Sequence, residues 1–357
     1  MSTDCVIARQ ETATGEDFSM TSRFRWIGLM VVMTWALLAA PQIASCATFV
    51  NVTVPAAKGG ATPTGINRSG TVVGYYSSTK GFDSFIWQTN GTVTTIHVPG
   101  VNRNFAQSIN ASGWVVGYDQ QAVGTLTHGF LRNPQYTTID APWAGTKDVD
   151  GTFPSSINDA GEIAGTYLDS NEVLHGFIRD ASGNYTSFDI SEGNLQTAFL
   201  GQDGQVAGSY TDTSSGMNHG YVRDTFGNIT VFDPPNASGT YVSGMNATGE
   251  VAGVYYSSGA YHGFIRDASG NMTTFDVSGI VYAGLAGIAD NGDVYGAYKN
   301  GGIFRGWKRS GATGLVSHFN DPAGAKGTQP LCISGNGKVA GYYFDSQKNT
   351  LDFEMHN

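Results

Sequence analysis

Four histidines recur at one position of a repeated motif and are the first candidates for chemistry. Each begins a His-Gly-aromatic triplet, at His128, His175, His219 and His262. Imidazole can serve as a metal ligand or as a general acid–base group. In a repeat protein, equivalent positions usually lie too far apart to share one metal ion, and a repeated polar side chain more often satisfies buried backbone groups between repeats. We therefore expect these histidines to hold neighbouring repeats together, and we expect neither a metal site nor a cofactor.

Arginines and aspartates recur with the histidines. The strand that begins at each histidine ends in arginine, and the following strand often ends in aspartate. The two series are Arg132, Arg179, Arg223, Arg266 and Arg309, and Asp140, Asp189, Asp233 and Asp276. We expect the arginines to pair with nearby acids. An acidic ring at a channel mouth is one hypothesis for the aspartates, but we favour aspartates that accept backbone N–H groups of the next turn.

One long connection supplies the candidate ligand-binding residues. Residues 142–151 (PWAGTKDVDG) make one repeat longer than the others, and the candidates within them are Trp143, Lys147, Asp148 and Asp150. An aromatic side chain beside charged groups on a long loop is typical of a ligand contact. An ordinary loop of variable length is the alternative.

No motif of a known catalytic chemistry accompanies these residues. The sequence lacks Gly-x-Ser-x-Gly, His-Glu-x-x-His and the phosphate-binding Gly-x-x-x-x-Gly-Lys-[Ser/Thr]. Residues 180–184 and 290–293 resemble calcium loops in composition but lack their spacing. Paired carboxylates for glycoside hydrolysis stay open, because partners distant in sequence leave no local pattern.

The elements that must position these residues come from an internal repeat. The pattern [Ile/Met]-Asn-x-x-Gly-x-Val-x-Gly recurs at intervals of 43–48 residues. Its first glycine falls at Gly70, Gly113, Gly161, Gly204, Gly249, Gly292 and Gly337. Each copy continues with short apolar runs separated by Asp-, Asn- and Gly-rich turns, which predicts hairpins and four strands per repeat.

A period of about 44 residues with four strands is typical of a β-propeller blade. The last repeat lacks its final strand, and residues 48–55 (TFVNVTVP) resemble the missing one. We therefore predict an all-β fold, a seven-bladed β-propeller of four-stranded blades in residues 48–357, closed by an N-terminal strand that completes the last blade. Closure would remove two open sheet edges.

The repeat also resembles a known family. The His-Gly-Phe strand after the Asn-x-x-Gly-x-Val-x-Gly turn is similar to the bacterial extracellular HAF repeats, with Gly129, Gly176, Gly220 and Gly263 standing where that motif has alanine. The sequence departs from it at residues 83–85, 305–307 and 351–353. The resemblance implies a secreted protein with a repeated β architecture, and it implies no particular activity.

The N-terminus predicts export. Residues 26–40 (WIGLMVVMTWALLAA) form an uncharged apolar run after Arg23 and Arg25, which is typical of a signal peptide. We predict a signal peptide in residues 1–47, cleaved after Ala47, with a true start at Met20. Residues 43–46 (IASC) also resemble a lipobox, so a lipid anchor on Cys46 is the alternative. Either way, we expect a secreted, periplasmic or surface protein of a bacterium. After Ala47 the only cysteine is Cys332, which is predicted to be a buried strand residue.

Composition narrows the function. The chain has 357 residues, 49 of them glycine, with 13% charged residues and a net charge of −10. Such a charge disfavours nucleic acid as a partner, and contact with a membrane is expected only through a lipid anchor. We expect a monomeric, non-catalytic binding module for a glycan or an extracellular protein. The alternatives are a propeller hydrolase or lyase that acts on an extracellular polymer or lactone at a channel mouth, and a purely structural surface protein.

Overall fold

The computed structural model describes residues 47–57, 59–191, 193–346 and 350–356. Almost all of the predicted signal peptide, including Met20 and Cys46, lies outside the described residues. Within them the chain is all-β, as predicted: strands and turns are present and no helix is found. In the same residues no helix is therefore long and apolar enough to span a membrane.

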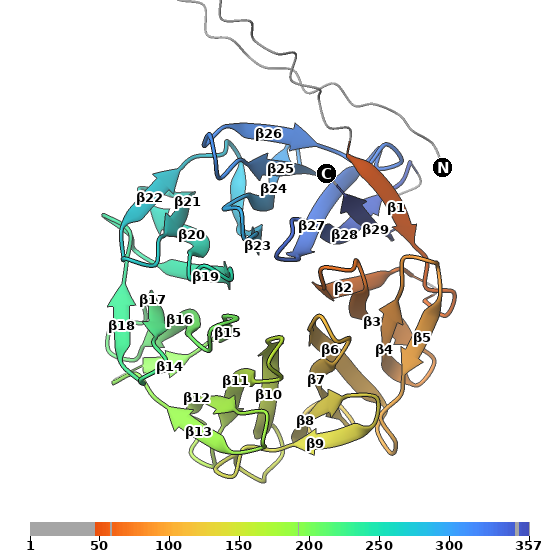
Figure 1. Cartoon of the computed structure of the whole chain (residues 1–357), viewed down its shortest axis with the longest axis vertical. Helices are drawn as coiled ribbons and strands as arrows, with labels where there is room; N and C mark the ends of the chain where they lie inside the picture. Colours follow the sequence, from red (N-terminus) through yellow and green to blue (C-terminus); the bar gives the residue numbers. More distant parts are fainter. Residues whose placement is uncertain (1–46, 58, 192, 347–349, 357) are drawn as a thin grey trace, which may run out of the picture.

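The strands form units of four arranged around a central axis (Figure 1). Each unit runs from an inner strand near the axis, through a second and a third strand, to an outer strand at the rim. Paired neighbours within a unit are antiparallel.

The inner strands are β2 (Ala61–Ile66), β6 (Arg103–Ile109), β10 (Gly151–Ile157), the short pair β14 (Gly193–Leu195) and β15 (Phe199–Leu200), β19 (Thr240–Met245), β23 (Ile280–Ile288) and β27 (Gly327–Ile333). The second strands are β3 (Val72–Ser78), β7 (Val115–Gln120), β11 (Ile163–Leu168), β16 (Val206–Asp212), β20 (Val251–Ser257), β24 (Val294–Asn300) and β28 (Val339–Phe344).

The third strands are β4 (Gly81–Trp87), β8 (Thr127–Arg132), β12 (Leu174–Arg179), β17 (Asn218–Arg223), β21 (Ala260–Arg266), β25 (Ile303–Arg309) and β29 (Thr350–His356). The outer strands are β5 (Val93–Ile96), β9 (Tyr136–Ile139), β13 (Tyr185–Phe188), β18 (Ile229–Phe232), β22 (Met272–Phe275), β26 (Val316–Phe319) and β1 (Thr48–Val52).

The two ends of the chain share one unit. Strand β1 pairs antiparallel with β29, with Thr48 opposite His356 and Val52 opposite Asp352, and β29 continues to β28 and β27. The outer strand of this unit therefore comes from the opposite end of the sequence. Elsewhere, β8 and β10 of successive units meet through one parallel pairing, between Thr127 and Gly151.

Inner strands carry a β-bulge, for example between Pro63 and Gly65 in β2 and between Pro154 and Ser156 in β10. A bulge bends the strand and increases its twist. Proline is tolerated there because the inner strand is an edge strand, where a missing N–H breaks no ladder. The bulge lies just before the turn that follows the inner strand and so helps to position that turn.

The core lies between units and depends on a repeated aromatic residue over a glycine. The aromatic third residue of the triplet is at most 2% exposed in every unit: Phe85, Phe130, Phe177, Tyr221, Phe264, Trp307 and Phe353. Its ring lies against the glycine of the second strand. A Cβ on Gly208 would lie 1.9 Å from the Thr197 carbonyl oxygen and 2.8 Å from the Tyr221 ring. The repeated glycine is thus required by close packing. Cys332 is buried in β27, as expected.

Candidate functional site

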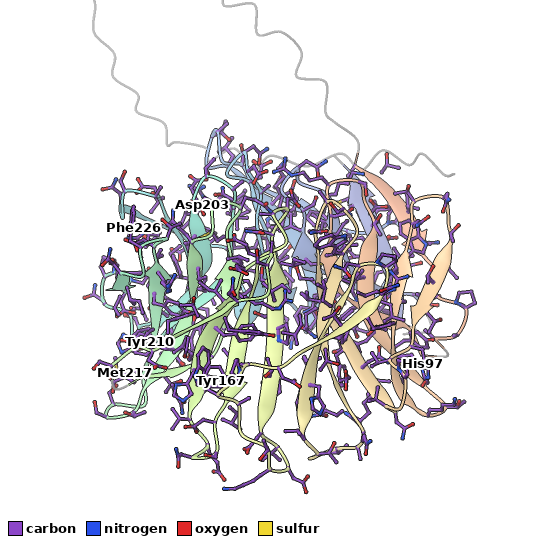
Figure 2. All side chains as sticks on the ribbon, turned by 60° about the horizontal axis from the view of Figure 1, so that its bottom comes forward. His97, Tyr167, Asp203, Tyr210, Met217 and Phe226 are labelled. Carbon is purple, nitrogen blue, oxygen red and sulfur yellow. The ribbon has the colours of Figure 1, made fainter. Side chains whose placement is uncertain are left out.

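The repeat places different groups on the two faces of the ring of strands (Figure 2). Asp203, in an Asn-x-x-Gly-type turn, and Phe226, in a hairpin turn, lie on one face, which we call the turn face. His97, Tyr167 and Tyr210 lie on the other, which we call the histidine face. The candidate residues divide between these two faces.

Each repeated histidine binds an aspartate of its own unit. The Nδ1 atoms of His128, His175, His219 and His262 lie 2.5–2.9 Å from carboxylate oxygens of Asp140, Asp189, Asp233 and Asp276. The first unit reverses the pair, with Asp83 and His97 3.6 Å apart. Because an ionised carboxylate only accepts hydrogen bonds, Nδ1 carries the proton. The expectation that these histidines join neighbouring units is therefore wrong, since the bond links the third strand to the end of the outer strand within one unit.

The pairs are further held by tyrosine. Tyr167 stacks on His175 with ring centroids 4.8 Å apart, and Tyr255 lies 5.1 Å from His262. Among the described residues, no group of three or more His, Cys, Asp or Glu side chains is suited to a metal ion. The repeated aspartates are thus occupied by histidine, and neither the acidic ring nor the capping of the following turn describes their main contact.

A repeated side-chain bond between units comes instead from the asparagine of the turn. Asn67 Nδ2 donates to the Asn110 carbonyl oxygen at 3.1 Å, and Asn110 Nδ2 donates to that of Asn158 at 3.1 Å. Asn246 repeats the bond to the Ala289 carbonyl oxygen at 3.0 Å. Each of these side chains is buried. The four strongest copies of the motif all carry this asparagine, which was the signal in the sequence. That it joins neighbouring units is revealed only by the three-dimensional structure.

The repeated arginines contact aromatic rings rather than acids. The guanidinium of Arg223 lies 5.4 Å from the Phe188 ring of the preceding unit, and that of Arg266 lies 5.3 Å from Phe232. Their Nη1 atoms donate to the carbonyl oxygen of the next residue. Cation–π contacts, and not the expected salt bridges, hold four of these arginines: those of Arg223, Arg266 and Arg309 join neighbouring units, whereas Arg179 contacts Tyr185 of its own unit.

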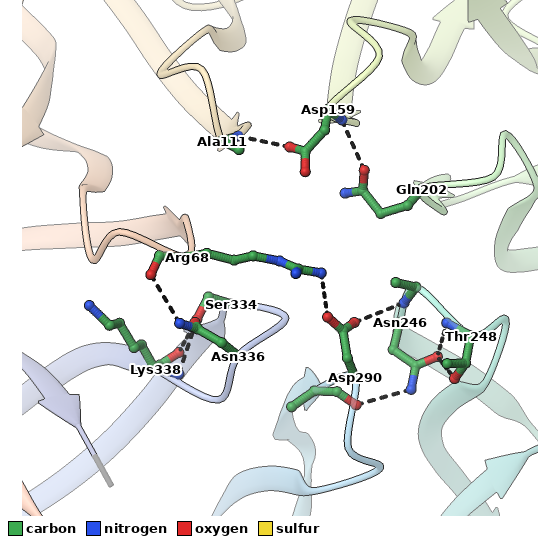
Figure 3. A network of polar contacts seen from close by, with 12 residues as sticks. Arg68, Ala111, Asp159, Gln202, Asn246, Thr248, Asp290, Ser334, Asn336 and Lys338 are labelled. Atoms are coloured by element: carbon green, nitrogen blue, oxygen red, sulfur yellow. Dashed lines mark hydrogen bonds and ion pairs between the residues drawn. The ribbon is translucent and has the colours of Figure 1, made fainter.

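A cavity of about 430 Å³ lies at the axis on the turn face, between the ends of the inner strands. Arg68 forms an ion pair with Asp290 across its mouth (Figure 3). A Cβ on Gly335 would lie 2.5 Å from Asp290 Oδ2, so the glycine leaves room for this pair. Other polar side chains at the mouth join units: Asp159 Oδ1 accepts the Ala111 N–H at 2.8 Å.

The connection predicted to bind a ligand joins β9 to β10, and its four candidates have different environments. The Trp143 side chain is 47% exposed and its ring centroid lies 6.0 Å from that of Tyr167, on the histidine face. Lys147 and Asp148 are exposed. Asp150 is buried, and its Oδ2 accepts the Lys147 N–H at 2.9 Å. The structure thus brings Trp143, Lys147 and Asp148 to the surface and turns Asp150 into the loop.

The neighbouring second strand holds a residue that sequence analysis missed. Asp119 of β7 stands where the second strands of the other units carry tyrosine, such as Tyr76 and Tyr167. It is only 5% exposed and lies opposite His128 in the register of β7 and β8. Burial raises the pKa of Asp119 to about 6, against the opposing effect of His128. Aligning the second strands would have revealed this exception.

Comparison with known proteins gives a fold class. No family model and no curated protein matches the chain. A solved streptogramin B lyase is 12% identical, with a TM-score of 0.58 over 87% of this chain and 97% of that one. A puromycin hydrolase is 11% identical, with a TM-score of 0.57 over 85% and 54%. TolB from Acinetobacter baumannii is 15% identical, with a TM-score of 0.50 over 70% and 63%.

The similar structures include β-propeller proteins. At such low identity the likeness concerns the fold alone, and the chain has a β-propeller fold. The four-stranded units described above are its blades.

Proposed function

We propose that the chain is an exported seven-bladed β-propeller of the HAF-repeat type, closed by β1. The seven copies of the turn and the pairing of β1 with β29 support this ring. An experimental structure is expected to have sevenfold pseudo-symmetry, and the protein is expected to be a monomer. Six or eight blades, or an open array, would contradict it.

The proposed activity is non-catalytic binding of an extracellular glycan on the histidine face. Trp143 carries this proposal, because a large aromatic side chain that is 47% exposed is presented by the connection that departs most from the repeat. Tryptophan offers a broad apolar face and one N–H donor. That combination suits the apolar face of a sugar ring and the hydroxyl groups at its edge.

The loop holds Trp143 in a defined position. Gly145 donates its N–H to the Leu168 carbonyl oxygen at 2.8 Å, and Lys147 Nζ donates to the Ser170 carbonyl oxygen at 3.2 Å. With the buried Asp150, these bonds anchor the loop to the next blade. A preorganised contact residue loses less conformational entropy on binding. The exposed Asp148 supplies a carboxylate acceptor for hydroxyl groups nearby.

The test is a glycan array probed with residues 48–357 and with two variants. Trp143→Ala is expected to weaken glycan binding about tenfold or more, since loss of one buried aromatic contact costs about 1–3 kcal/mol. Phe226→Ala is the matched control, because Phe226 is 90% exposed but lies on the opposite face (Figure 2). Equal binding by Trp143→Ala and the parent would contradict the proposed site. Binding to a protein and to no glycan would favour the protein ligand.

The second candidate is a hydrolase or lyase with its site at the axial cavity. It is favoured by the cavity of about 430 Å³ and by the Arg68–Asp290 ion pair at its mouth, which supplies one cation for a developing anion and one carboxylate. A broad screen on extracellular polymers and lactones would detect it, and Arg68→Gln is expected to remove any activity found. No activity and no ligand would favour a structural surface protein.

A further inference from the structure

Two departures from the repeat converge at one place on the histidine face. One is the long connection that carries Trp143, and the other is Asp119 in place of a tyrosine. Asp140 ends blade two only three residues before Trp143 and holds His128 at 2.9 Å. The Thr127 N–H, next to His128, donates to the Asp150 carbonyl oxygen at 3.0 Å. The strand that carries His128 is thus bonded to the base of the Trp143 loop.

The buried carboxylate of Asp119 has no hydrogen bond from a described side chain that would compensate for its loss of water contacts. No hydrogen bond from another described side chain reaches its carboxylate, which shares one face of the sheet with His128. Such a group is costly to bury unless its charge is useful or offset. In the equivalent place of other blades, tyrosine fills the space without charge, for example Tyr255 beside His262. The exchange therefore adds negative charge at this junction alone.

The surface around Trp143 is also acidic. Asp140 and Asp189 are 45% and 61% exposed, and Asp148 is exposed too. Hydrogen bonding from the Val173 N–H lowers the pKa of Asp169, which keeps that neighbour ionised. The nearby cation Lys147 is directed to the Ser170 carbonyl oxygen. A ligand at Trp143 therefore meets carboxylates on both adjoining blades.

We propose that the ligand of the Trp143 site carries an ammonium group, as an unacetylated amino sugar does, and that Asp119 and Asp140 select it. The inference rests on the proposed glycan function and names its ligand class. An ammonium group beside an indole gains a cation–π contact. Asp140 attracts it from the surface, and the buried Asp119, opposite His128 on the adjacent strand, adds a charge that is screened less by salt.

The titration of Asp119 provides a test of this selectivity: a purely structural role of Asp119 would not make the preference for an ammonium group depend on pH. The titratable groups that face Asp119 are His128 on β8, Asp140 after β9 and Tyr136 on β9. Burial raises the pKa of Asp119 to about 6, so its carboxylate is charged above that pH and neutral below it. The contribution of Asp119 to the affinity for a cationic ligand is therefore expected to fall as the pH falls through about 6.

The experiment compares oligomers of glucosamine with oligomers of N-acetylglucosamine of the same length, by calorimetry on residues 48–357. At about pH 7 the amine form is expected to bind about tenfold more tightly, a difference of about 1.4 kcal/mol. At about pH 5 the preference of the parent is expected to approach that of Asp119→Asn, which lacks this carboxylate, while the affinity for the acetylated form stays the same.

Two variants of Asp119 complete the test. Asp119→Tyr restores the residue of the other blades and Asp119→Asn keeps the shape without charge, so both are expected to lose most of the preference and its pH dependence. Folding is checked by thermal melting, and either folded variant suffices. Equal, Trp143-dependent binding of both oligomers would overturn this inference and leave the glycan function standing. Failure of both oligomers to bind while other glycans bind through Trp143 would overturn it as well.

Discussion

At the scale of single residues, the repeated histidines are local supports of each blade. His128 and its partner Asp140 are 42% and 45% exposed, and an exposed ion pair contributes only about 0.2–1 kcal/mol. Replacing His128 by alanine is expected to lower stability by about that amount. Replacing His175, His219 or His262, whose side chains are only 18–25% exposed, is expected to lower it somewhat more, and the effects are expected to be roughly additive across separate blades. Thermal melting of the four variants measures this effect.

The first blade suggests the control. Since it carries Asp83 and His97 in reversed positions, with Tyr76 opposite Asp83 as Tyr255 is opposite His262, the double variant His262→Asp, Asp276→His is expected to recover most of the stability lost by His262→Ala. One histidine whose loss abolishes binding or activity without any change in stability would contradict the structural role.

The turn asparagines are expected to matter more. Asn110 is 3% exposed; its side chain accepts the Trp114 N–H at 2.9 Å and donates to the Asn158 carbonyl oxygen at 3.1 Å. Asn110→Ala leaves both partners unpaired and is expected to lower the free energy of unfolding by about 1–3 kcal/mol per unpaired group. Chemical denaturation is the measurement.

Asn110→Asp separates the two bonds, because it keeps the acceptor for Trp114 and removes the donor to Asn158. It is expected to be destabilised through the lost contact between blades. Asn184→Ala, in an exposed hairpin turn, is the control and is expected to change little. Parent-like stability of Asn110→Asp at neutral pH would contradict the role between blades.

At the scale of elements, strand β1 is expected to contribute strongly to the stability of the whole chain. It pairs with β29 along its whole length, and without it β29 would be an exposed edge. Deleting residues 48–55 is expected to lower the melting temperature of the whole chain and to promote aggregation. An unchanged melting temperature and an unchanged monomer peak in size-exclusion chromatography would count against the proposed closure.

The seam beside β1 is also expected to respond to pH. Asp352 accepts the Ala61 N–H at 3.0 Å, and burial raises its pKa to about 7. The folded chain therefore keeps a proton that the unfolded chain loses at about pH 4. Since the folded state binds more protons between these values, stability is expected to fall as the pH rises from about 4 to about 7.

Asp352→Asn keeps an acceptor for Ala61 and removes this titration. Its melting temperature is expected to depend less on pH than that of the parent over the same range. The buried Glu354, whose pKa burial also raises to about 7, accounts for part of the remaining slope. Identical slopes for the parent and Asp352→Asn would show that Asp352 does not titrate in this way.

At the scale of the whole molecule, the proposed compartment can be tested on the chain made in a bacterial host. Mass spectrometry of the mature protein is expected to find Thr48 as its first residue, or a lipid on Cys46. The physical reason is the apolar run of residues 26–40 after two arginines. An intact N-terminus at Met1 or Met20 would remove the argument for export.

The repeat allowed much of this molecule to be predicted from its sequence. Periodic apolar runs and turn residues determine strands locally, so the all-β fold and the burial of Phe177 and Cys332 followed from pattern alone. The same pattern indicated a β-propeller and located the unusual connection around Trp143. These properties depend on residues close in sequence, for which period and turn chemistry are sufficient.

Tertiary structure decided which residues meet. It paired His175 with Asp189 inside one blade, gave the contacts between blades to Asn110 and its equivalents, and turned Asp150 into its loop. It also placed the single exception Asp119 opposite His128, whose strand is bonded to the Trp143 connection through Thr127 and Asp150. Side-chain bonds between residues about 44 positions apart depend on the twist and register of neighbouring blades, and a linear pattern does not contain that geometry.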